Sequence, residues 1–211
     1  MTERFAIYYA PPRDAVLTKR AESWLARPDL QPLTASARRY GFHATLEAPM
    51  VLAQSRAAFE DALGAFASRT APVELELAPA LIDGFLALIA SPQPELVTAL
   101  AAKVVEEFEP FRAPLGQAER NRRMLARLTP RQVELLDRYG YPYVLEEFRF
   151  HMTLTDRLPD NRRARLLAEA SGWFADCLAK PVLVDRLVLF HEPAPGAPFA
   201  RLGDYLLRGT A

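Results

Sequence analysis

Two of the three histidines in this chain of 211 residues lie in matching short segments. His43 lies in the segment Gly-Phe-His-Ala-Thr-Leu and His151 in the segment Arg-Phe-His-Met-Thr-Leu, so both contain Phe-His-x-Thr-Leu. A chance match between two such windows would rarely also pair two of only three histidines. The repeat therefore indicates that these two histidines share a role.

Both copies of the repeat have the pattern of a β-strand with one polar and one apolar face. Side chains alternate between the faces of a strand, so His43 and Thr45 point to one side and their apolar neighbours to the other. The same alternation places His151 and Thr153 together. If a pseudo-two-fold relates the two strands, the two polar faces can meet across one cleft.

Such a cleft suits the cleavage of a phosphodiester. A neutral imidazole can take a proton from the attacking oxygen while a protonated imidazole gives one to the leaving oxygen, because the unperturbed pKa of histidine is about 6.5. The hydroxyls of Thr45 and Thr153 can donate hydrogen bonds to the phosphoryl oxygens as negative charge develops. The two copies are nearly equivalent, so either His43 or His151 can be the base. This chemistry needs no metal and no cofactor.

Three further residues are candidates for binding the substrate. Arg149 is two residues before His151 and shares its face, so its guanidinium can pair with a phosphate; Gly41 holds the matching position in the first copy. The rings of Tyr8 and Tyr40 can stack on a sugar or a base, whereas we expect most of the other tyrosines to pack in the interior.

Three segments carry a resemblance to a known family: Tyr-Gly-Phe-His-Ala-Thr-Leu (residues 40–46), Tyr-Gly-Tyr-Pro-Tyr (139–143) and Phe-Arg-Phe-His-Met-Thr-Leu-Thr (148–155). The paired His-x-Thr motifs resemble those of the two-histidine (2H) phosphoesterase superfamily. Within this superfamily, the sequences of all three segments are similar to those of DUF1045, a bacterial family associated with phosphonate utilisation. The likeness covers nearly the whole chain.

The resemblance implies a bilobal fold and the cleavage of a small cyclic or 2′,5′-type phosphodiester. The association with phosphonates implies a ribosyl 1,2-cyclic phosphate as substrate, in the breakdown of phosphonates. His43, Thr45, His151 and Thr153 match the functional positions of the superfamily. The implied protein is therefore a metal-independent phosphoric diester hydrolase.

The order of expected elements indicates an α+β fold. It predicts two mainly antiparallel sheets with pseudo-two-fold symmetry around a central cleft and helices on the outer faces. We expect a single bilobal domain, 1–211, with approximate repeat halves 1–108 and 109–211 that each carry one motif. The expected strands are 4–10, 40–46, two within 72–90 around the turn Asp83-Gly84, 147–155, 182–190 and 204–207, and Pro49 is expected to end the second of them. The expected helices are 14–26, 55–69, 94–108, 130–138 and 160–178. Thr129 is expected to cap the helix 130–138, with Pro130 in its first turn. Residues 27–39 are expected to form a loop, and residues 109–128 an arginine-rich connector with a helical part.

Composition limits the partners of this chain. Lys and Arg (26) balance Asp and Glu (26), so the chain has no surplus of cations for gripping long nucleic acid. No signal-peptide pattern and no apolar run of about 18 residues is present, so we expect a cytoplasmic protein that does not bind membranes. The single Cys177 excludes an intrachain disulfide and is expected to be a buried thiol.

The alternatives are a metal site, a binding module and several other hydrolase types. A zinc site could combine the two histidines with Glu47 or Asp156, but neither carboxylate has a metal-ligand spacing. A cleft that binds a phosphorylated metabolite or an RNA end without turnover is the second functional hypothesis. Glycine-rich phosphate loops, Gly-x-Ser-x-Gly and Cys-x-x-Cys motifs are absent.

Two further sets of residues are assigned no catalytic role. His191 has no counterpart in the repeat and is expected at the surface or behind the site. Arg120, Arg122 and Arg123 are expected to form a solvated helix face, and a role toward phosphate is the less favoured alternative.

Overall fold

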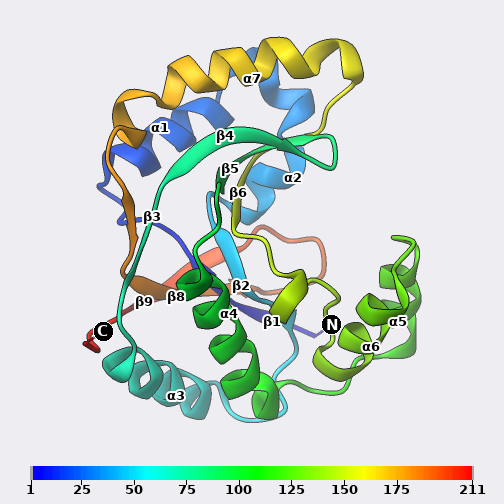
Figure 1. The fold of residues 1–211 in the computed structure, drawn as a ribbon. Helices are drawn as coiled ribbons and strands as arrows, with labels where there is room; N and C mark the ends of the chain where they lie inside the picture. Colours follow the sequence, from blue (N-terminus) through cyan, green and yellow to red (C-terminus); the bar gives the residue numbers. More distant parts are fainter. Residues whose placement is uncertain (1, 211) are drawn as a thin grey trace.

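Antiparallel strands form the framework of the computed structural model, which describes residues 2–210 (Figure 1). A four-stranded sheet has the order β2 (Ala44–Met50), β1 (Arg4–Tyr9), β8 (Arg186–Glu192), β9 (Ala200–Leu206). A three-stranded sheet has the order β4 (Leu77–Ile82), β5 (Phe85–Ala90), β6 (His151–Arg157). The two strands that carry the histidine motifs, β2 and β6, are therefore each an edge strand of a different sheet.

A short ribbon connects the two sheets. It pairs β3 (Val73–Leu75) with β7 (Val182–Val184), and these strands continue almost directly into β4 and β8. This two-stranded ribbon is an addition to the two expected sheets. Each large sheet combines strands from both halves of the sequence, so the boundary expected near residue 108 does not separate one sheet from the other.

Helices cover the outer faces of both sheets, as the sequence predicted. The three-stranded sheet packs against α1 (Val16–Leu25), α2 (Ala35–Tyr40) and α7 (Asp160–Phe174). The four-stranded sheet packs against α3 (Arg56–Arg69) and α4 (Glu95–Phe108). Figure 1 shows the first group above and the second below, so the molecule has two lobes.

The lobes exchange helices. The helices α1 and α2 follow β1 and precede β2, yet they pack on β6 of the other sheet. The helix α4 follows β5 of the three-stranded sheet but packs on β2. The chain therefore crosses between the lobes several times, which ties the two sheets together.

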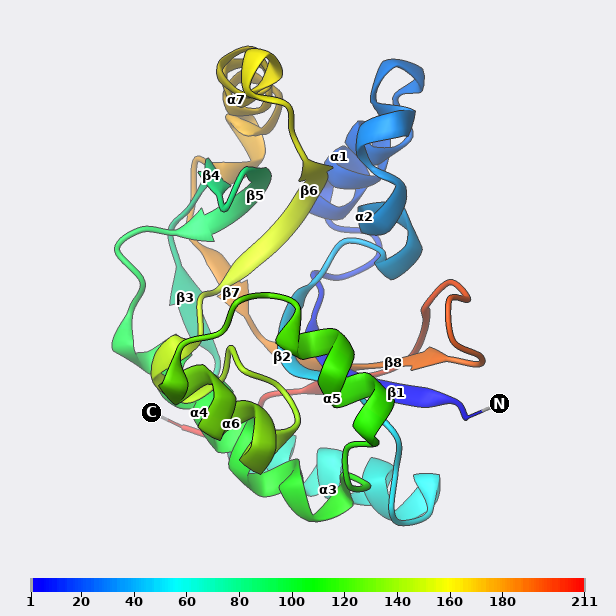
Figure 2. The ribbon, with the colours of Figure 1, turned by 90° about the vertical axis from the view of Figure 1, so that its right-hand side faces the viewer.

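A helical pair projects at the side of the two lobes. It consists of α5 (Gln117–Met124) and α6 (Pro130–Tyr139), and Figure 2 shows it on the same side of the molecule as β1 and β2. Short 3-10 turns complete the chain: η1 (Pro28–Leu33), η2 (Glu109–Phe111), η3 (Leu145–Glu147) and η4 (Asp176–Leu178). No helix within residues 2–210 has the length and apolar composition that a bilayer span requires.

Local sequence signals account for two of the boundaries. Thr129 and Gln132 form a capping box at the start of α6, with Pro130 in its first turn and Gly140 in a left-handed conformation (φ 70°) after its end. The hairpin between β4 and β5 turns at Asp83 and Gly84, which both have positive φ as the expected turn requires. Both features confirm the sequence prediction.

The segment before the first motif differs from the prediction. Residues 27–39 were expected to be a loop and Tyr40 to begin a strand, but η1 and α2 fill this segment and the strand begins at Ala44. The backbone N–H of Ser36 at the start of α2 donates to the carboxylate of Asp156 on β6 at 3.1 Å, so a long-range contact stabilises the helix. Gly41, with φ 75°, then turns the chain into β2.

Other strand boundaries also differ from the prediction. The strand expected at 147–155 begins at His151 because η3 precedes it, and the strand expected at 204–207 begins at Ala200. Pro49 lies inside β2 rather than ending it, which an edge strand tolerates because its outer N–H positions need no partner.

One core receives the apolar sides of both motifs. Ala44 and Leu46 of the first strand and Met152 and Leu154 of the second are buried in the same hydrophobic cluster. The indole N–H of Trp24 on α1 donates to the carbonyl of Leu154 at 3.2 Å, which joins a helix inserted between β1 and β2 to β6. Packing on this side fixes the direction of the histidines on the other.

Leu154→Ala should lower the free energy of unfolding by about 2–5 kcal/mol, because it leaves a cavity where the side chain has no exposed surface. Urea denaturation followed by circular dichroism measures the change. The matched control is Leu202→Ala on β9, where the side chain is 38% exposed and the loss should stay below about 0.5 kcal/mol. Equal losses in the two variants would contradict the assignment of Leu154 to the core.

Candidate active site

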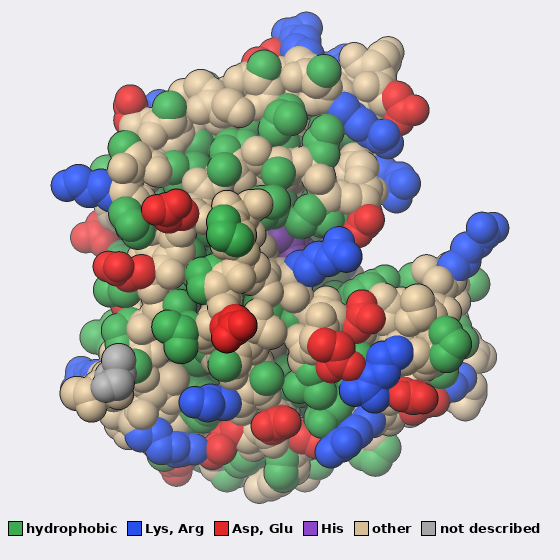
Figure 3. Space-filling model, viewed as in Figure 1, with side chains coloured by type: hydrophobic (Ala, Val, Ile, Leu, Met, Phe, Trp, Pro, Cys, Tyr) green, Lys and Arg blue, Asp and Glu red, His purple; other side chains and the backbone are tan. Residues whose placement is uncertain are grey.

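Both His-x-Thr motifs line one cavity between the lobes. The cavity has a volume of about 470 Å³, and its walls include His43, Thr45, His151 and Thr153. Figure 3 shows a histidine side chain at the bottom of a hollow between the upper and lower parts of the molecule, with basic side chains beside it. The two motifs, far apart in the sequence, thus meet at a single site.

The same hydrogen bond orients the ring of each histidine. Nδ1 of His43 lies 2.9 Å from the carbonyl oxygen of Gly41, and Nδ1 of His151 lies 2.8 Å from that of Arg149. A carbonyl oxygen only accepts, so Nδ1 donates in both rings and the proton of the neutral form resides there. Nε2 of each ring is then the atom available for proton transfer.

The strand alternation predicted from the sequence is present in both copies. The four motif side chains are partly exposed toward the cavity, whereas the residues between and beside them are buried. Thr45 lies opposite Tyr8 of β1, and His151 lies opposite Ile89 of β5. The strands β2 and β6 also contact each other, which brings the two polar faces together.

His43 occupies the more enclosed of the two positions. Its ring stacks on Tyr8 with the centroids 3.8 Å apart and the planes 20° apart, and Tyr40 lies 6.0 Å away. Burial lowers the pKa of His43 to about 4, against the opposing effect of the Gly41 carbonyl and with a further lowering by the charge of His151. The imidazole is therefore neutral near pH 7, and Oγ1 of Thr45, at 3.3 Å, can donate to its Nε2.

His151 has more polar surroundings. Burial lowers the pKa of His151 as well, but the Arg149 carbonyl and the negative charge of Asp83 oppose this and the Arg149 guanidinium adds to it. The ring of Phe85 lies 5.7 Å away at a tilted angle. A carboxylate thus favours the cationic form of His151, and none is among the groups that shift the pKa of His43.

The candidate binding residues are placed unequally. Tyr8 and Tyr40 line the cavity, whereas Arg149 is exposed and is not among the lining residues; its carbonyl, not its guanidinium, holds His151. The basic side chains in the cavity wall are Arg4 from β1 and Arg122 and Arg123 from α5. A role for the Arg149 side chain in substrate binding stays a prediction.

The expectation of a solvated helix face holds for Arg122 but not for Arg123, whose side chain is only 15% exposed. Both lie in the cavity wall, although the side chain of Arg122 is also 62% exposed to solvent. The density of arginines in residues 109–128 was the available signal, but placing them at the cavity requires the fold of the α5–α6 pair.

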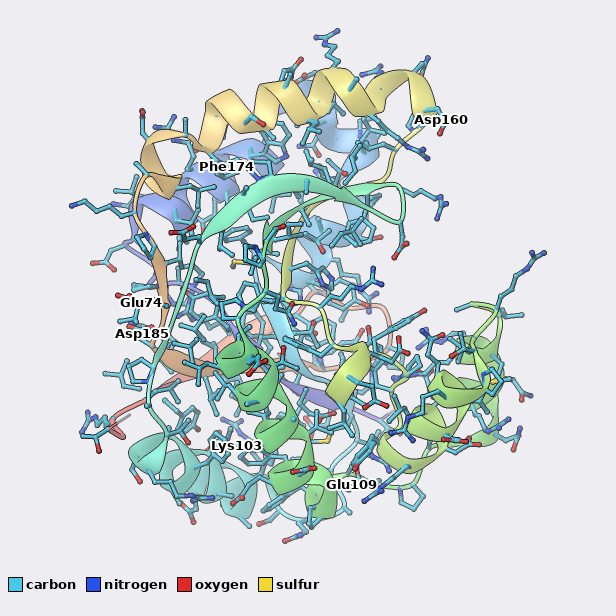
Figure 4. The ribbon with its side chains drawn as sticks, in the orientation of Figure 1. Glu74, Lys103, Glu109, Asp160, Phe174 and Asp185 are labelled. Carbon is cyan, nitrogen blue, oxygen red and sulfur yellow. The ribbon has the colours of Figure 1, made fainter. Side chains whose placement is uncertain are left out.

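A second cavity of about 340 Å³ adjoins the first and shares part of its wall with it. Glu47 lines it and is only 4% exposed; burial, and then the charge of Glu109, raise the pKa of Glu47 to about 8 against the effect of Arg112. Glu109 itself lies at the end of α4 (Figure 4) and accepts hydrogen bonds at 2.8 and 2.5 Å from Arg112. Glu47 is therefore a neutral carboxylic acid near pH 7.

A family model described as "Protein of unknown function (DUF1045)" matches residues 45–200. The chain belongs to the DUF1045 family. Two curated relatives are both named ribose 1,5-bisphosphate phosphokinase PhnN. The one from Janthinobacterium sp. (strain Marseille) is 35% identical over 93% of this chain and 49% of its own length. The one from Laribacter hongkongensis (strain HLHK9) is 36% identical over 98% of this chain and 53% of its own length. The chain thus spans about half the length of the curated relatives it matches.

Solved structures share the fold of this DUF1045 chain. TT0787 of Thermus thermophilus aligns with a TM-score of 0.53 and 17% identity, over 99% of this chain and 100% of its own. E. coli LigT, in a complex with 3′-AMP, aligns with a TM-score of 0.50 and 15% identity, over 98% of both chains. At this level of identity the similarity shows the fold alone, which this chain shares with TT0787 and LigT.

The carboxylates considered for a metal site have other surroundings in this DUF1045 protein. Asp156 accepts from the backbone of Ser36, and Glu47 faces the second cavity. In the part of the chain from residue 2 to residue 210, no three His, Cys, Asp or Glu side chains are grouped to hold a metal ion.

The remaining candidates lie outside both cavities. His191 pairs with Glu3 at 2.6 Å. Cys177 lies in η4 and is only partly buried, so the expectation of a buried thiol holds only in part. Burial raises the pKa of this thiol.

The imidazole of His43 should titrate near pH 4 and show the Nδ1–H tautomer when neutral, because burial against Tyr8 disfavours the charged ring. Nitrogen-15 NMR of the imidazoles as a function of pH measures both. The folded-state pKa lies below the unfolded value of about 6.5, so stability that is complete above pH ~6.5 is lost as the pH falls through about 4.

Tyr8→Ala is the informative comparison for this titration. Removing the stacked ring admits water to His43 and should move its midpoint up toward 6.5. A midpoint near 6.5 already in the unmodified protein would disprove the role of burial.

Proposed function

We propose that this chain is a metal-independent 2H phosphoesterase that cleaves a small phosphodiester. The observation that carries the proposal is the convergence of two Nε2 atoms and two threonine hydroxyls on one cavity, with both imidazoles fixed through Nδ1. The fold of the 2H phosphoesterases supports the same assignment.

In the proposed reaction, His43 is the general base and His151 the general acid. His43 is neutral near pH 7, so its Nε2 can accept the proton of an attacking water while the water oxygen bonds to phosphorus. The bond from phosphorus to the leaving oxygen breaks, and Nε2–H of His151 protonates that oxygen. The negative charge of Asp83 favours the cationic form that this donor requires.

The hydroxyls of Thr45 and Thr153 serve the phosphoryl group. Each lies two residues after a histidine on the same face, so each can donate to a non-bridging oxygen beside the reacting bonds. The hydroxyl of Thr45 then turns from Nε2 of His43 to the substrate, which leaves Nε2 free to accept the proton of water. The product is a phosphate monoester on one side and a free hydroxyl on the other.

For the substrate we favour a cyclic or 2′,5′-type phosphodiester, and in particular a ribosyl 1,2-cyclic phosphate from the breakdown of phosphonates. The relatives' name refers to ribose 1,5-bisphosphate, and hydrolytic opening of a 1,2-cyclic phosphate at the C2 oxygen leaves a phosphate on C1 of ribose. A cavity of about 470 Å³ suits a molecule of this size, and the ring of Tyr40 can pack on the sugar.

The kinase activity in the relatives' name is not part of this proposal. The chain spans about half of those proteins and contains no glycine-rich phosphate loop of the Walker type.

One observation favours a second candidate, a module that binds a phosphorylated metabolite or an RNA end without turnover. Burial lowers the pKa of both histidines, which reduces the fraction of His151 that can act as an acid near neutral pH. Phosphorus NMR on a panel of cyclic phosphates distinguishes the two, because only an enzyme converts the cyclic signal to that of a monoester.

His43→Ala and His151→Ala should each lower kcat by about 10²- to 10⁴-fold, the usual contribution of a general acid or base. The assay is phosphorus NMR with ribosyl 1,2-cyclic phosphate and nucleoside 2′,3′-cyclic phosphates, with and without EDTA. His191→Ala is the matched control and should retain full activity, since it lies outside the cavity. Full activity in either cavity variant, or its loss in EDTA, would refute the mechanism.

The dependence of kcat/KM on pH should be bell-shaped with its maximum on the acidic side of 6.5. The rate falls below about pH 4, where His43 becomes protonated, and falls again as the pH rises through the lowered pKa of His151 and the acid loses its proton. A stopped assay across pH 3.5–9 tests this. A maximum at pH 8 or above would exclude these roles.

A further inference from the structure

The helix α5 forms part of both cavity walls without contributing to a hydrophobic core. None of its residues is buried. It is held by polar contacts instead: Arg120 pairs with Asp137 of α6 at 2.6 Å, and Arg123 donates to the carbonyl of Gly140. The position of α5 therefore depends on charges.

Glu119 lies at the centre of the arginines that line the cavities. Its Oε1 is 2.6 Å from Arg122, 2.9 Å from Arg123 and 4.0 Å from Nη1 of Arg4. All four residues line both cavities, so the cluster lies where the two join. Burial opposes ionisation of Glu119, but hydrogen bonds from the two α5 arginines outweigh it and lower its pKa.

The cluster has more positive than negative charge. One carboxylate faces three guanidinium groups, of which Arg4 also pairs with Glu192 at 2.5 Å. Within residues 2–210, Glu119 is the only acidic partner of Arg122 and Arg123. A single oxygen atom accepts from both, which is also how an oxygen of a phosphate group would be held.

Helix stabilisation alone does not account for this arrangement. Pairs at i,i+3 and i,i+4 on a helix commonly add a little stability. Here, however, the third cation comes from β1, a separate element, and the carboxylate lines both cavities, one of which the histidines also line.

We propose that Arg4, Arg122 and Arg123 form a binding site for a phosphate-type anion and that Glu119 occupies this site as an internal competitor when the anion is absent. Binding then exchanges one anion for another, which keeps the guanidinium groups paired in both states. The inference rests on the proposed function only in treating the anion as a group of the substrate or product; the exchange itself does not involve the histidines.

Binding of inorganic phosphate to the full chain, measured by isothermal titration calorimetry, tests the exchange without turnover. Glu119→Gln keeps the size of the side chain but removes the competing charge, and should lower the Kd by about three- to tenfold. Arg122→Gln should raise the Kd, because it removes the guanidinium group that pairs with Glu119 and that would bind the phosphate in its place. The matched control is Glu134→Gln on α6. It breaks an ion pair with Arg131 that has a similar length, 3.0 Å, and it should leave the Kd for phosphate unchanged.

The same measurements in a His151→Ala background separate the two possible places for phosphate. If Glu119→Gln lowers the Kd for phosphate by the same factor in this background, the arginine cluster is the binding site. If Glu119→Gln no longer changes the Kd, phosphate binds between the imidazoles, and the proposal is overturned. An equal or higher Kd in Glu119→Gln, or no phosphate binding in any variant, also overturns it. Absence of diesterase activity would count against the proposed function and leaves this outcome unaffected.

Discussion

The meeting of two edge strands organises the whole site. The strands β2 and β6 are edge strands of different sheets, and they contact each other. Unpaired edges are normally protected from other chains, and here α4 packs on β2 while α1 and α2 pack on β6. Because both strands turn their apolar side chains into one core, their polar side chains have only one direction left, which is the cavity between the lobes.

Within this nearly symmetric frame, the surroundings of the two imidazoles differ. The Nδ1 hydrogen bonds are equivalent, but His43 lies under a tyrosine ring while His151 lies near Asp83 and Arg149. Acid–base catalysis requires one neutral and one protonated partner at the same moment. A duplicated motif supplies two identical imidazoles. Their different surroundings in the cavity wall can give them different pKa values.

The sequence predicted those parts of the structure that short-range rules determine. The alternation around His43 and His151, the cap at Thr129 and the turn at Asp83 each follow from a few neighbouring residues. The helix α2 could not be predicted in this way, because Asp156, 120 positions away, supplies a hydrogen-bond partner for its first turn.

The candidate binding residues likewise depend on contacts between residues that are far apart in the sequence. The spacing of Arg149 and His151 predicts that both lie on one face of a strand, yet the strand begins only at His151 and the arginine side chain is exposed. Arg4 and Arg123 reach the cavity from β1 and from a separate helical pair. Nothing in the spacing of these two residues relates them to the motif, since only the folded chain brings them beside it.

The exchange of helices between the lobes also bears on how a ligand reaches the histidines. A hinge between two lobes opens easily when few chain segments cross it, but here α1, α2 and α4 are each packed on the sheet opposite the one they adjoin in sequence. Separating the lobes would pull these helices from their packing. Displacing α5 would cost less than separating the lobes, because this part of the cavity wall buries none of its own side chains.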